Sequence, residues 1–425
     1  MTCEVAVLNK YAVVIAADSA VTTTNGYGEA RYSKGGNKIF QLSHKEPVGI
    51  MIFGSAAVCG MPWEVVIKAY RGEHLQDNKF DSVTEYAENF FSFLKSAASP
   101  ISAAVRDASF HSVLQRVALT ILQRIEDDDP EIGNDQVPLA VRQQKASAAW
   151  TKVVAAIDSL PTASPELQAA ETKSIAAPPQ TFRQDVEKGL KVGVLSGIIT
   201  PDELVTSTCR WYFRQYELFQ PTTGVVIAGY GKLEYFPCIV EYSVSGFVGD
   251  EFVCREVRRT HVTNEAPGAI LPFATTSAVD AFMRGVGADV FFQVGAAYER
   301  FAVDFARSML KAAQVAEPAS FEQEAEKSQI EFGRTWYGNV LASHFSPLEA
   351  VIASLPLEEM THLAETLVTL ESLKERVTSP KQSVGGPIDV AVITKAEGLV
   401  WIKRKHFFDS DKNLRFLLRQ RAIYQ

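Results

Sequence analysis

The chain has 425 residues, of which 47% are hydrophobic and 22% are charged. This average composition excludes wholesale disorder and fibrous repeats. The 42 basic and 50 acidic side chains give a formal net charge of -8, which argues against a general nucleic-acid binder. No apolar run approaches the roughly 18 residues that a membrane span needs, and Glu4 and Asp18 interrupt the start, where a signal peptide would be apolar. We therefore expect a cytoplasmic protein with no nucleic-acid and no membrane partner.

The first 55 residues predict strands joined by turns. Short β-rich runs occur at 4–8, 12–17, 38–42 and 48–53, with turn signals at Asn25-Gly26 and Gly35-Gly36. Apolar residues then recur at helical spacing in 63–70, 83–94 and 113–125. The chain thus changes from strands to helices after Gly54.

The stretch from 127 to 180 is rich in Ala, Ser, Pro and Gln, and its prolines prevent one long helix. We interpret 75–220 as a helical insertion with a Pro/Ala/Ser-rich linker near 156–180. The core would then comprise 1–74 and 221–425.

Strands are predicted again at 224–230, 238–244 and 252–257, followed by helices at 277–311, 321–340 and 347–376. A last pair of strands is expected at 389–395 and 399–403. Because every pair of strands can form a hairpin, we expect an α+β protein in which two antiparallel sheets stack between helical layers, in the order α-β-β-α.

No metal and no cofactor is predicted. The five cysteines are scattered without a Cys-x-x-Cys pair, and the seven histidines show no spacing that would place two rings on one helical face. The glycines near 26–28 and 229–231 lack the spacing of a phosphate-binding loop.

Six short motifs in chain order resemble landmarks of proteasome β-type subunits, which are N-terminal nucleophile hydrolases. The motifs are TCEVAV (2–7), VVIAADS (13–19), NKIF (37–40), IFGSA (52–56), VIAGY (226–230) and VGGPIDVAVI (384–393). The resemblance covers about 2–71, 222–295 and 360–405, and it implies that family's sandwich fold in a divergent bacterial-type member with large helical insertions.

The resemblance implies that Thr2 is the nucleophile, exposed as the first residue when Met1 is removed. A threonine hydroxyl needs an adjacent base, which a free α-amine on the same residue provides. By the same resemblance, Lys38 supplies a fixed positive charge, Asp18 holds that lysine, and the Gly54 N–H donates to the oxyanion. Thr275 is the hydroxyl that would bond the amine.

Alternatives remain at several positions. Lys34 has the family's usual count from the threonine, whereas Lys38 has its usual context before an apolar strand, and Cys3 is a second conceivable nucleophile. Lys381 and Val384 stand where active members commonly carry an aspartate and a serine.

The implied activity is cleavage of peptide or protein substrates through an acyl-enzyme, with Val21 and Ile52 lining an apolar specificity pocket. A small-molecule amidase and a catalytically inactive assembly subunit are the alternatives, because a fold does not fix a substrate. The resemblance also implies a homo-oligomer. Aromatic residues at 90–91, 211–213 and 291–292 could form its contacts or simply be core.

Overall fold

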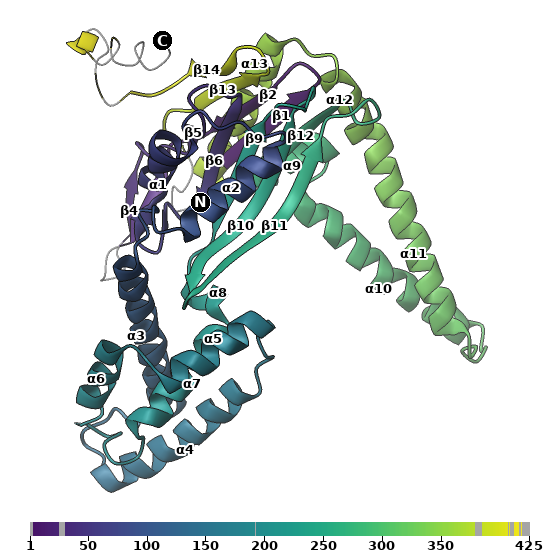
Figure 1. The fold of residues 1–425 in the computed structure, drawn as a ribbon. Coiled ribbons are helices and arrows are strands. Elements are labelled where there is room, and N and C mark those ends of the chain that lie inside the picture. Colours follow the sequence, from purple (N-terminus) through teal and green to yellow (C-terminus); the bar gives the residue numbers. More distant parts are fainter. Residues whose placement is uncertain are drawn as a thin grey trace.

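The computed structural model in Figure 1 describes residues 3–24, 30–191, 193–378 and 385–406, together with 408, 412–415 and 418. One antiparallel sheet has the strand order β12-β1-β2-β13-β14. Its strands are β1 (Cys3–Asn9), β2 (Val13–Ala17), β12 (Gly268–Ala274), β13 (Asp389–Thr394) and β14 (Gly398–Lys403). We call it the first sheet.

The second sheet has the order β11-β10-β9-β6-β5 and is also antiparallel. Its strands are β5 (Ile39–Gln41), β6 (Val48–Gly54), β9 (Thr223–Gly229), β10 (Cys238–Val248) and β11 (Glu251–His261). Two small hairpins, β3 (Val21–Thr24) with β4 (Ala30–Ser33) and β7 (Ala57–Val58) with β8 (Met61–Pro62), stand beside the sheets.

The two sheets pack face to face. Ala6 and Ile15 of the first sheet share a hydrophobic cluster with Met51 and Val226 of the second. Every residue of β1 and β2 is buried, because one face of these strands meets the other sheet and the opposite face meets helices. Double burial explains why both strands have almost continuous apolar sequences.

Helices cover the outer face of each sheet. On the second sheet lie α1 (Trp63–Ala69), a π-helical turn η1 (Tyr70–Leu75) and α2 (Val83–Lys95), all in one cluster with that sheet. On the first sheet lie α9 (Ser277–Arg284), α12 (Ser346–Ile352) and α13 (Leu357–Thr378). The layers therefore follow the order helix, sheet, sheet, helix, which agrees with the α+β class predicted from the sequence.

A separate helical unit packs against the turn end of the β10–β11 hairpin (Figure 1). It contains α3 (Ala103–Asp128), α4 (Leu139–Asp158), α5 (Pro165–Ala176), α6 (Gln180–Gly189), α7 (Pro201–Arg214) and α8 (Tyr216–Phe219). Thr200 and Glu203 form a capping box at the start of α7, which fixes where that helix begins. The helices from α3 to α7 share one hydrophobic cluster, which also includes Val248 at the end of β10, whereas α2 packs with the second sheet. The proposed domain boundaries stay a prediction.

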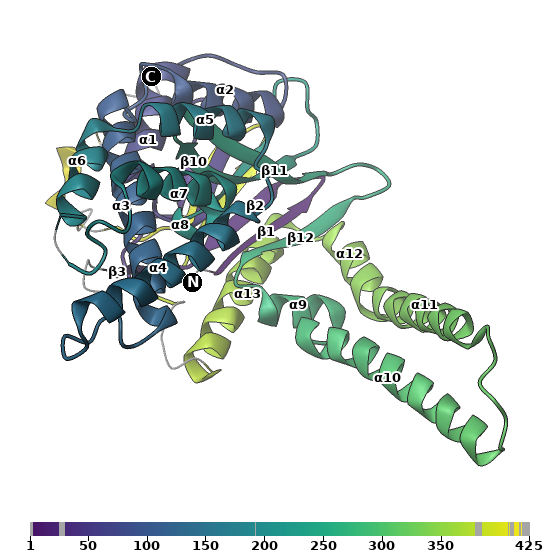
Figure 2. The ribbon, with the colours of Figure 1, turned by 90° about the horizontal axis from the view of Figure 1, so that it is seen from below.

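A helical arm projects from the opposite side of the molecule (Figures 1 and 2). It consists of α10 (Ala288–Ala312) and α11 (Phe321–Val340), and η2 (Leu341–Phe345) returns the chain to α12. None of the described side chains of α10 and α11 belongs to the three hydrophobic clusters around the sheets.

The fold differs from the sequence predictions in several places, among them the small hairpins β3–β4 and β7–β8, which were not predicted. The strand β12 was not predicted; it contains Pro272, which is tolerated because β12 lies at a sheet edge. The predicted helix 277–311 is broken at Gly285, whose φ of +69° ends α9. The predicted helix 347–376 is broken before α13, next to Pro356. Within the described part of the chain, no helix has both the length and the apolar character needed to cross a membrane.

Candidate active site

A buried ion pair links the first sheet to the second. Lys38 Nζ lies 2.6 Å from Asp18 Oδ1, and the two side chains are 7% and 0% exposed. Asp18 directly follows β2, and Lys38 directly precedes β5. The attraction is strong because little water reaches the pair to screen it. The structure thus brings together two of the residues selected from the sequence.

Three backbone N–H groups complete the environment of Asp18. Cys3 donates to Oδ1 at 3.0 Å, while Ala20 and Gly385 donate to Oδ2 at 3.2 and 2.8 Å. A carboxylate with four hydrogen-bond donors, one of them a charged ammonium group, is held in one orientation. Because Cys3 is the first residue of β1, the ion pair is held beside the start of the first strand.

The local sequence explains why Lys38, and not Lys34, reaches Asp18. The backbone N–H of Ile52 donates to the Lys38 carbonyl at 2.9 Å, so Lys38 is already in register with β6. Lys34 lies in the preceding loop, is exposed, and has its Nζ 6.0 Å from the centre of the Tyr32 ring. The shared register gives Lys38 a fixed direction that a loop residue lacks.

The predicted nucleophile Thr2 lies outside the described residues, as do Lys381 and Val384. The neighbouring Cys3 is fully buried, and its side chain joins the cluster between the first sheet and its helices. Burial raises the pKa of the Cys3 thiol well above its usual value, and the charge of Glu371 raises it further. The protonated thiol is a poor nucleophile, which argues against Cys3 in that role.

Gly54 ends β6 in a conformation that requires glycine. Its φ is +79°, and a Cβ at this position would lie 2.7 Å from the carbonyl oxygen of Thr222. The next residue, Ser55, donates its N–H to the same Thr222 oxygen at 3.2 Å. The turn is therefore fixed, and the role of Gly54 as an oxyanion donor stays a prediction.

Thr275 lies half-buried between β12 and α9, next to Ala274, which pairs with Cys3. The start of α9 is held by the buried carboxylate of Glu371, which accepts from the Ala278 N–H at 2.6 Å and the Ser277 hydroxyl at 2.8 Å. Glu371 thus fixes the segment that carries Thr275. Sequence reasoning missed it, because it lies within an amphipathic helix far along the chain.

The two predicted substrate-binding residues lie in different surroundings. Val21 is half-buried at the start of β3. Ile52 is 5% exposed and packs in the cluster below α1 and α2. A cavity of about 580 Å³ opens beside the turn after Gly54, lined by residues that include Ser55, Met61, Ser109 and Gln220. Substrate contacts of Val21 and Ile52 stay predictions.

Glu4 is a buried carboxyl group that sequence reasoning did not select. It is fully buried in β1, and neither carboxylate oxygen has a hydrogen-bond partner among the described residues. Burial raises its pKa well above the usual value, the charge of Lys38 lowers it, and the charge of Asp18 raises it. Glu4 therefore favours its neutral form and lies within electrostatic range of the ion pair.

Comparison with known proteins gave one type of match. No protein-family model matches the chain, and no curated protein matches it. Among solved structures, the chain is similar to one titled as an Anbu (Gly-1) mutant from Hyphomicrobium sp. strain MC1. The two chains are 10% identical, the match covers 99% of this chain and 96% of the other, and the TM-score is 0.29.

These findings correct the family assignment made from the sequence. The six motifs suggested a proteasome β-type subunit, but no family model matches, and a TM-score of 0.29 at 10% identity supports at most a distant relationship. Such a similarity establishes neither the N-terminal nucleophile hydrolase sandwich nor an activity. The assignment was wrong because each motif is a short apolar strand with a glycine or a polar residue, a combination that unrelated sheets also use.

Proposed function

We propose that this protein is a threonine-type amide hydrolase that cleaves peptide bonds through an acyl-enzyme intermediate. Thr2 is the nucleophile, and its α-amine, free once Met1 is removed, is the base. The observation that carries the proposal is the buried Lys38–Asp18 pair, because Asp18 also bonds the backbone N–H of Cys3, the residue after Thr2.

In the proposed reaction, the neutral amine accepts the hydroxyl proton while Oγ attacks the substrate carbonyl. The resulting oxyanion accepts hydrogen bonds, among them the one predicted from the Gly54 N–H. The protonated α-amine of Thr2 then returns its proton to the substrate nitrogen as the C–N bond breaks. The substrate's amine leaves, and an ester remains on Thr2. Water hydrolyses this ester by the same proton path. The charge of Lys38 favours the neutral amine over the ammonium form and stabilises developing negative charge.

The burial of the ion pair supports a functional role for Lys38. Removing two charges from water costs several kcal/mol per ion, and apolar replacements of similar size are often as stable. A lysine that is 7% exposed is therefore better explained by a need for its charge at this position.

One observation favours a second candidate, a catalytically inactive assembly subunit. Asp18 accepts hydrogen bonds from four described donors, three of them backbone N–H groups and the fourth the side chain of Lys38. Such a set of contacts also suffices to fasten β1, β2, β5 and the segment before β13. Activity measurements separate the two candidates.

The nucleophile is tested by intact mass and by Thr2→Ala. The purified protein should lack Met1 and hydrolyse fluorogenic peptides, and Thr2→Ala should abolish turnover while retaining the wild-type circular dichroism spectrum. Thr151→Ala, an exposed threonine on α4, is the matched control and should keep full activity. Retained Met1 without turnover supports the inactive subunit. Equal turnover by wild type and Thr2→Ala contradicts the mechanism. Hydrolysis of simple amides without peptides indicates a small-molecule amidase.

The cation is tested by comparing Lys38→Met with Lys34→Met. Loss of a preorganised electrostatic group typically costs about 100-fold or more in rate, so kcat for Lys38→Met should fall at least that far. Methionine retains most of the buried side-chain volume. Lys34→Met should remain near wild type because its side chain is exposed. The reverse order would mean that Lys34 supplies the charge.

Self-association is also proposed, through the helical arm of α10 and α11. Of the aromatic runs noted in the sequence, 90–91 and 211–213 are core, because all five of these side chains are buried. Phe292, in contrast, is 70% exposed. The arm also exposes Val290, Phe301, Phe305, Met309, Ile330 and Tyr337. So many large apolar side chains on one projecting hairpin are typical of a protein interface, and a second copy of the chain is the proposed partner.

A further inference from the structure

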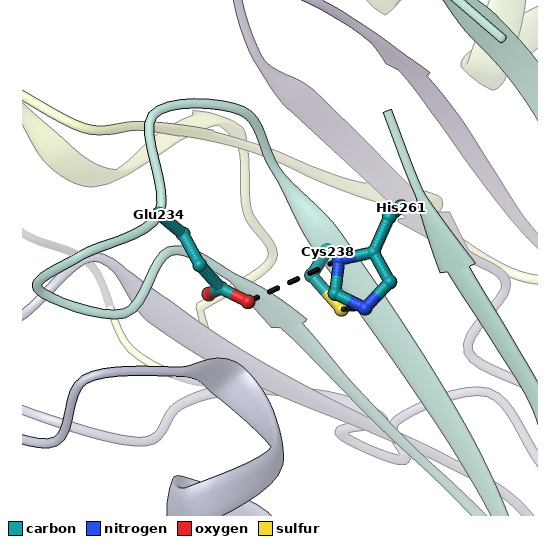
Figure 3. A group of neighbouring side chains, drawn as sticks. All are labelled: Glu234, Cys238 and His261. Atoms are coloured by element: carbon teal, nitrogen blue, oxygen red, sulfur yellow. Dashed lines mark hydrogen bonds and ion pairs between the residues drawn. The ribbon is translucent and has the colours of Figure 1, made fainter. Parts of the chain in front are cut away.

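Three side chains that commonly bind metals meet at one end of the second sheet (Figure 3). Cys238 begins β10, His261 ends β11, and the two are direct partners in the antiparallel register. Glu234 lies in the loop between β9 and β10. One donor atom from each side chain lies within 4.8 Å of the other two.

The separation of the cysteine sulfur from one ring nitrogen of His261 suits a tetrahedral ion. Cys238 Sγ and His261 Nε2 are 3.5 Å apart. Bond lengths of about 2.3 Å to sulfur and 2.0–2.1 Å to nitrogen give roughly the same separation at a tetrahedral angle. Glu234 faces the other ring nitrogen, with Oε1 4.0 Å from His261 Nδ1, and the His261 side chain is 46% exposed. It can therefore rotate to bring the three donors around one centre.

The carboxylate of Glu234 is already oriented by other bonds. Its Oε2 accepts the backbone N–H of Gly231 at 2.7 Å and that of Val83, the first residue of α2, at 3.0 Å. Oε1 is left to face His261. Fixed hydrogen bonds of this type are what orients carboxylate ligands in protein metal sites.

We propose that Glu234, Cys238 and His261 bind one Zn²⁺ ion, with water as the fourth ligand. A set of one sulfur, one nitrogen and one oxygen donor matches the ligand preference of zinc. The carboxylate and the metal-bound thiolate together neutralise the charge of the ion, because a coordinating thiol loses its proton. The exposed side of His261 gives the ion and the water access to the site.

The same three residues resemble a nucleophile–base–acid arrangement, but burial argues against a catalytic cysteine. Cys238 has no exposed surface, and burial raises its pKa to about 12. A nucleophile must be reachable and at least partly ionised without a metal. The zinc ion, in contrast, needs contact with the sulfur only from the side of His261 and Glu234.

The proposed zinc site lies apart from the candidate active site. Gly229 pairs with both Val48 and Cys238, whereas Thr223, six residues earlier on β9, pairs with Gly54. At about 3.3 Å per residue this places the zinc site roughly 20 Å from Gly54 along the sheet. Bound zinc would fasten the open end of the β10–β11 hairpin to the loop that also holds the start of α2.

The test is metal binding by the full chain. Apo-protein is titrated with Zn²⁺ and, separately, with Co²⁺ as a spectroscopic probe. We expect one equivalent of Zn²⁺ to be retained after dialysis, and Co²⁺ to give both tetrahedral d–d bands and a near-ultraviolet thiolate-to-cobalt band. Saturable binding without the thiolate band, or no retained zinc, would overturn the proposal.

Variants assign the site to its residues. Cys238→Ser should remove the thiolate band, whereas Cys254→Ser, a free thiol on the neighbouring strand, should keep it. His261→Gln alters an exposed side chain and so avoids a folding defect. It should weaken Zn²⁺ binding by more than the about 10–100-fold that loss of an outer-shell partner costs. Unchanged affinity in His261→Gln, or rapid alkylation of Cys238 by iodoacetamide regardless of added zinc, would contradict the assignment.

Discussion

Replacing Asp18 with asparagine removes one charge from the buried pair and leaves Lys38 without a counter-ion. Breaking a buried pair in this way typically destabilises a protein by about 3–5 kcal/mol. The four donors around Asp18 come from Lys38, Cys3, Ala20 and Gly385. The NH₂ group of asparagine would face some of these donors and cannot accept their hydrogen bonds. The expected loss is thus a large fraction of the about 5–15 kcal/mol by which native proteins are stable.

Urea unfolding monitored by circular dichroism measures this loss as a change in free energy. Asp18→Asn should unfold about 3–5 kcal/mol more easily than wild type, and adding Lys38→Met should recover part of the loss because the unpaired cation is gone. Glu324→Gln disrupts the exposed pair with Lys327 and should change stability by less than about 1 kcal/mol. An Asp18→Asn loss no larger than that of Glu324→Gln would refute the reasoning, as would a double variant less stable than Asp18→Asn.

Three further outcomes are expected. Because the pKa of Glu4 is raised in the folded protein, its ionisation destabilises the folded state once the pH exceeds the ordinary glutamate pKa of about 4.3. The free energy of unfolding of Glu4→Gln should therefore increase relative to that of wild type as the pH rises, by up to ~1.4 kcal/mol per pH unit. A gain that does not change between pH 4.5 and 7.5 in urea unfolding would disprove this. Gly54→Ala should lose at least about 1–2 kcal/mol because of its positive φ, and a wild-type melting temperature would contradict that strain. In light scattering, wild type should be larger than the 46.7 kDa monomer, and Phe301→Glu with Phe305→Glu should reduce its mass; a monomeric wild type would exclude the interface.

The sequence was sufficient for those parts of the fold that local patterns determine. Alternating or continuous apolar runs located β1, β2, β6 and the β13–β14 hairpin, and helical spacing located α1 and α2. It failed at β12, because Pro272 hides an edge strand, and at Gly285, where a single backbone angle divides one periodic segment into two helices.

Within the site, Asp18 and Lys38 were selected through the resemblance to proteasome β-type subunits. Local context decided only between Lys38 and Lys34, because a lysine directly before an apolar strand inherits the direction of that strand. Glu4 could not be recognised, since one acid within an apolar run gives no sign that both faces of the strand are covered. Cys238 and His261 were likewise beyond reach, because they are 23 residues apart and meet only through the register of a long hairpin. That hairpin contains two irregularities, so counting residues from its turn would misplace the pair.

The hydrogen-bond donors to the Asp18 carboxylate become available at different times during synthesis of the chain. Its donors from Cys3, Ala20 and Lys38 are near in sequence, but the N–H of Gly385 is 367 residues away. At roughly 5–20 residues per second, the last donor leaves the ribosome about 20–70 s after the others. Until then β2 lacks its neighbour β13 as well. A nascent or truncated chain therefore carries an incompletely held carboxylate, so the proposed hydrolase would gain its activity only when its C-terminal strands join the sheet.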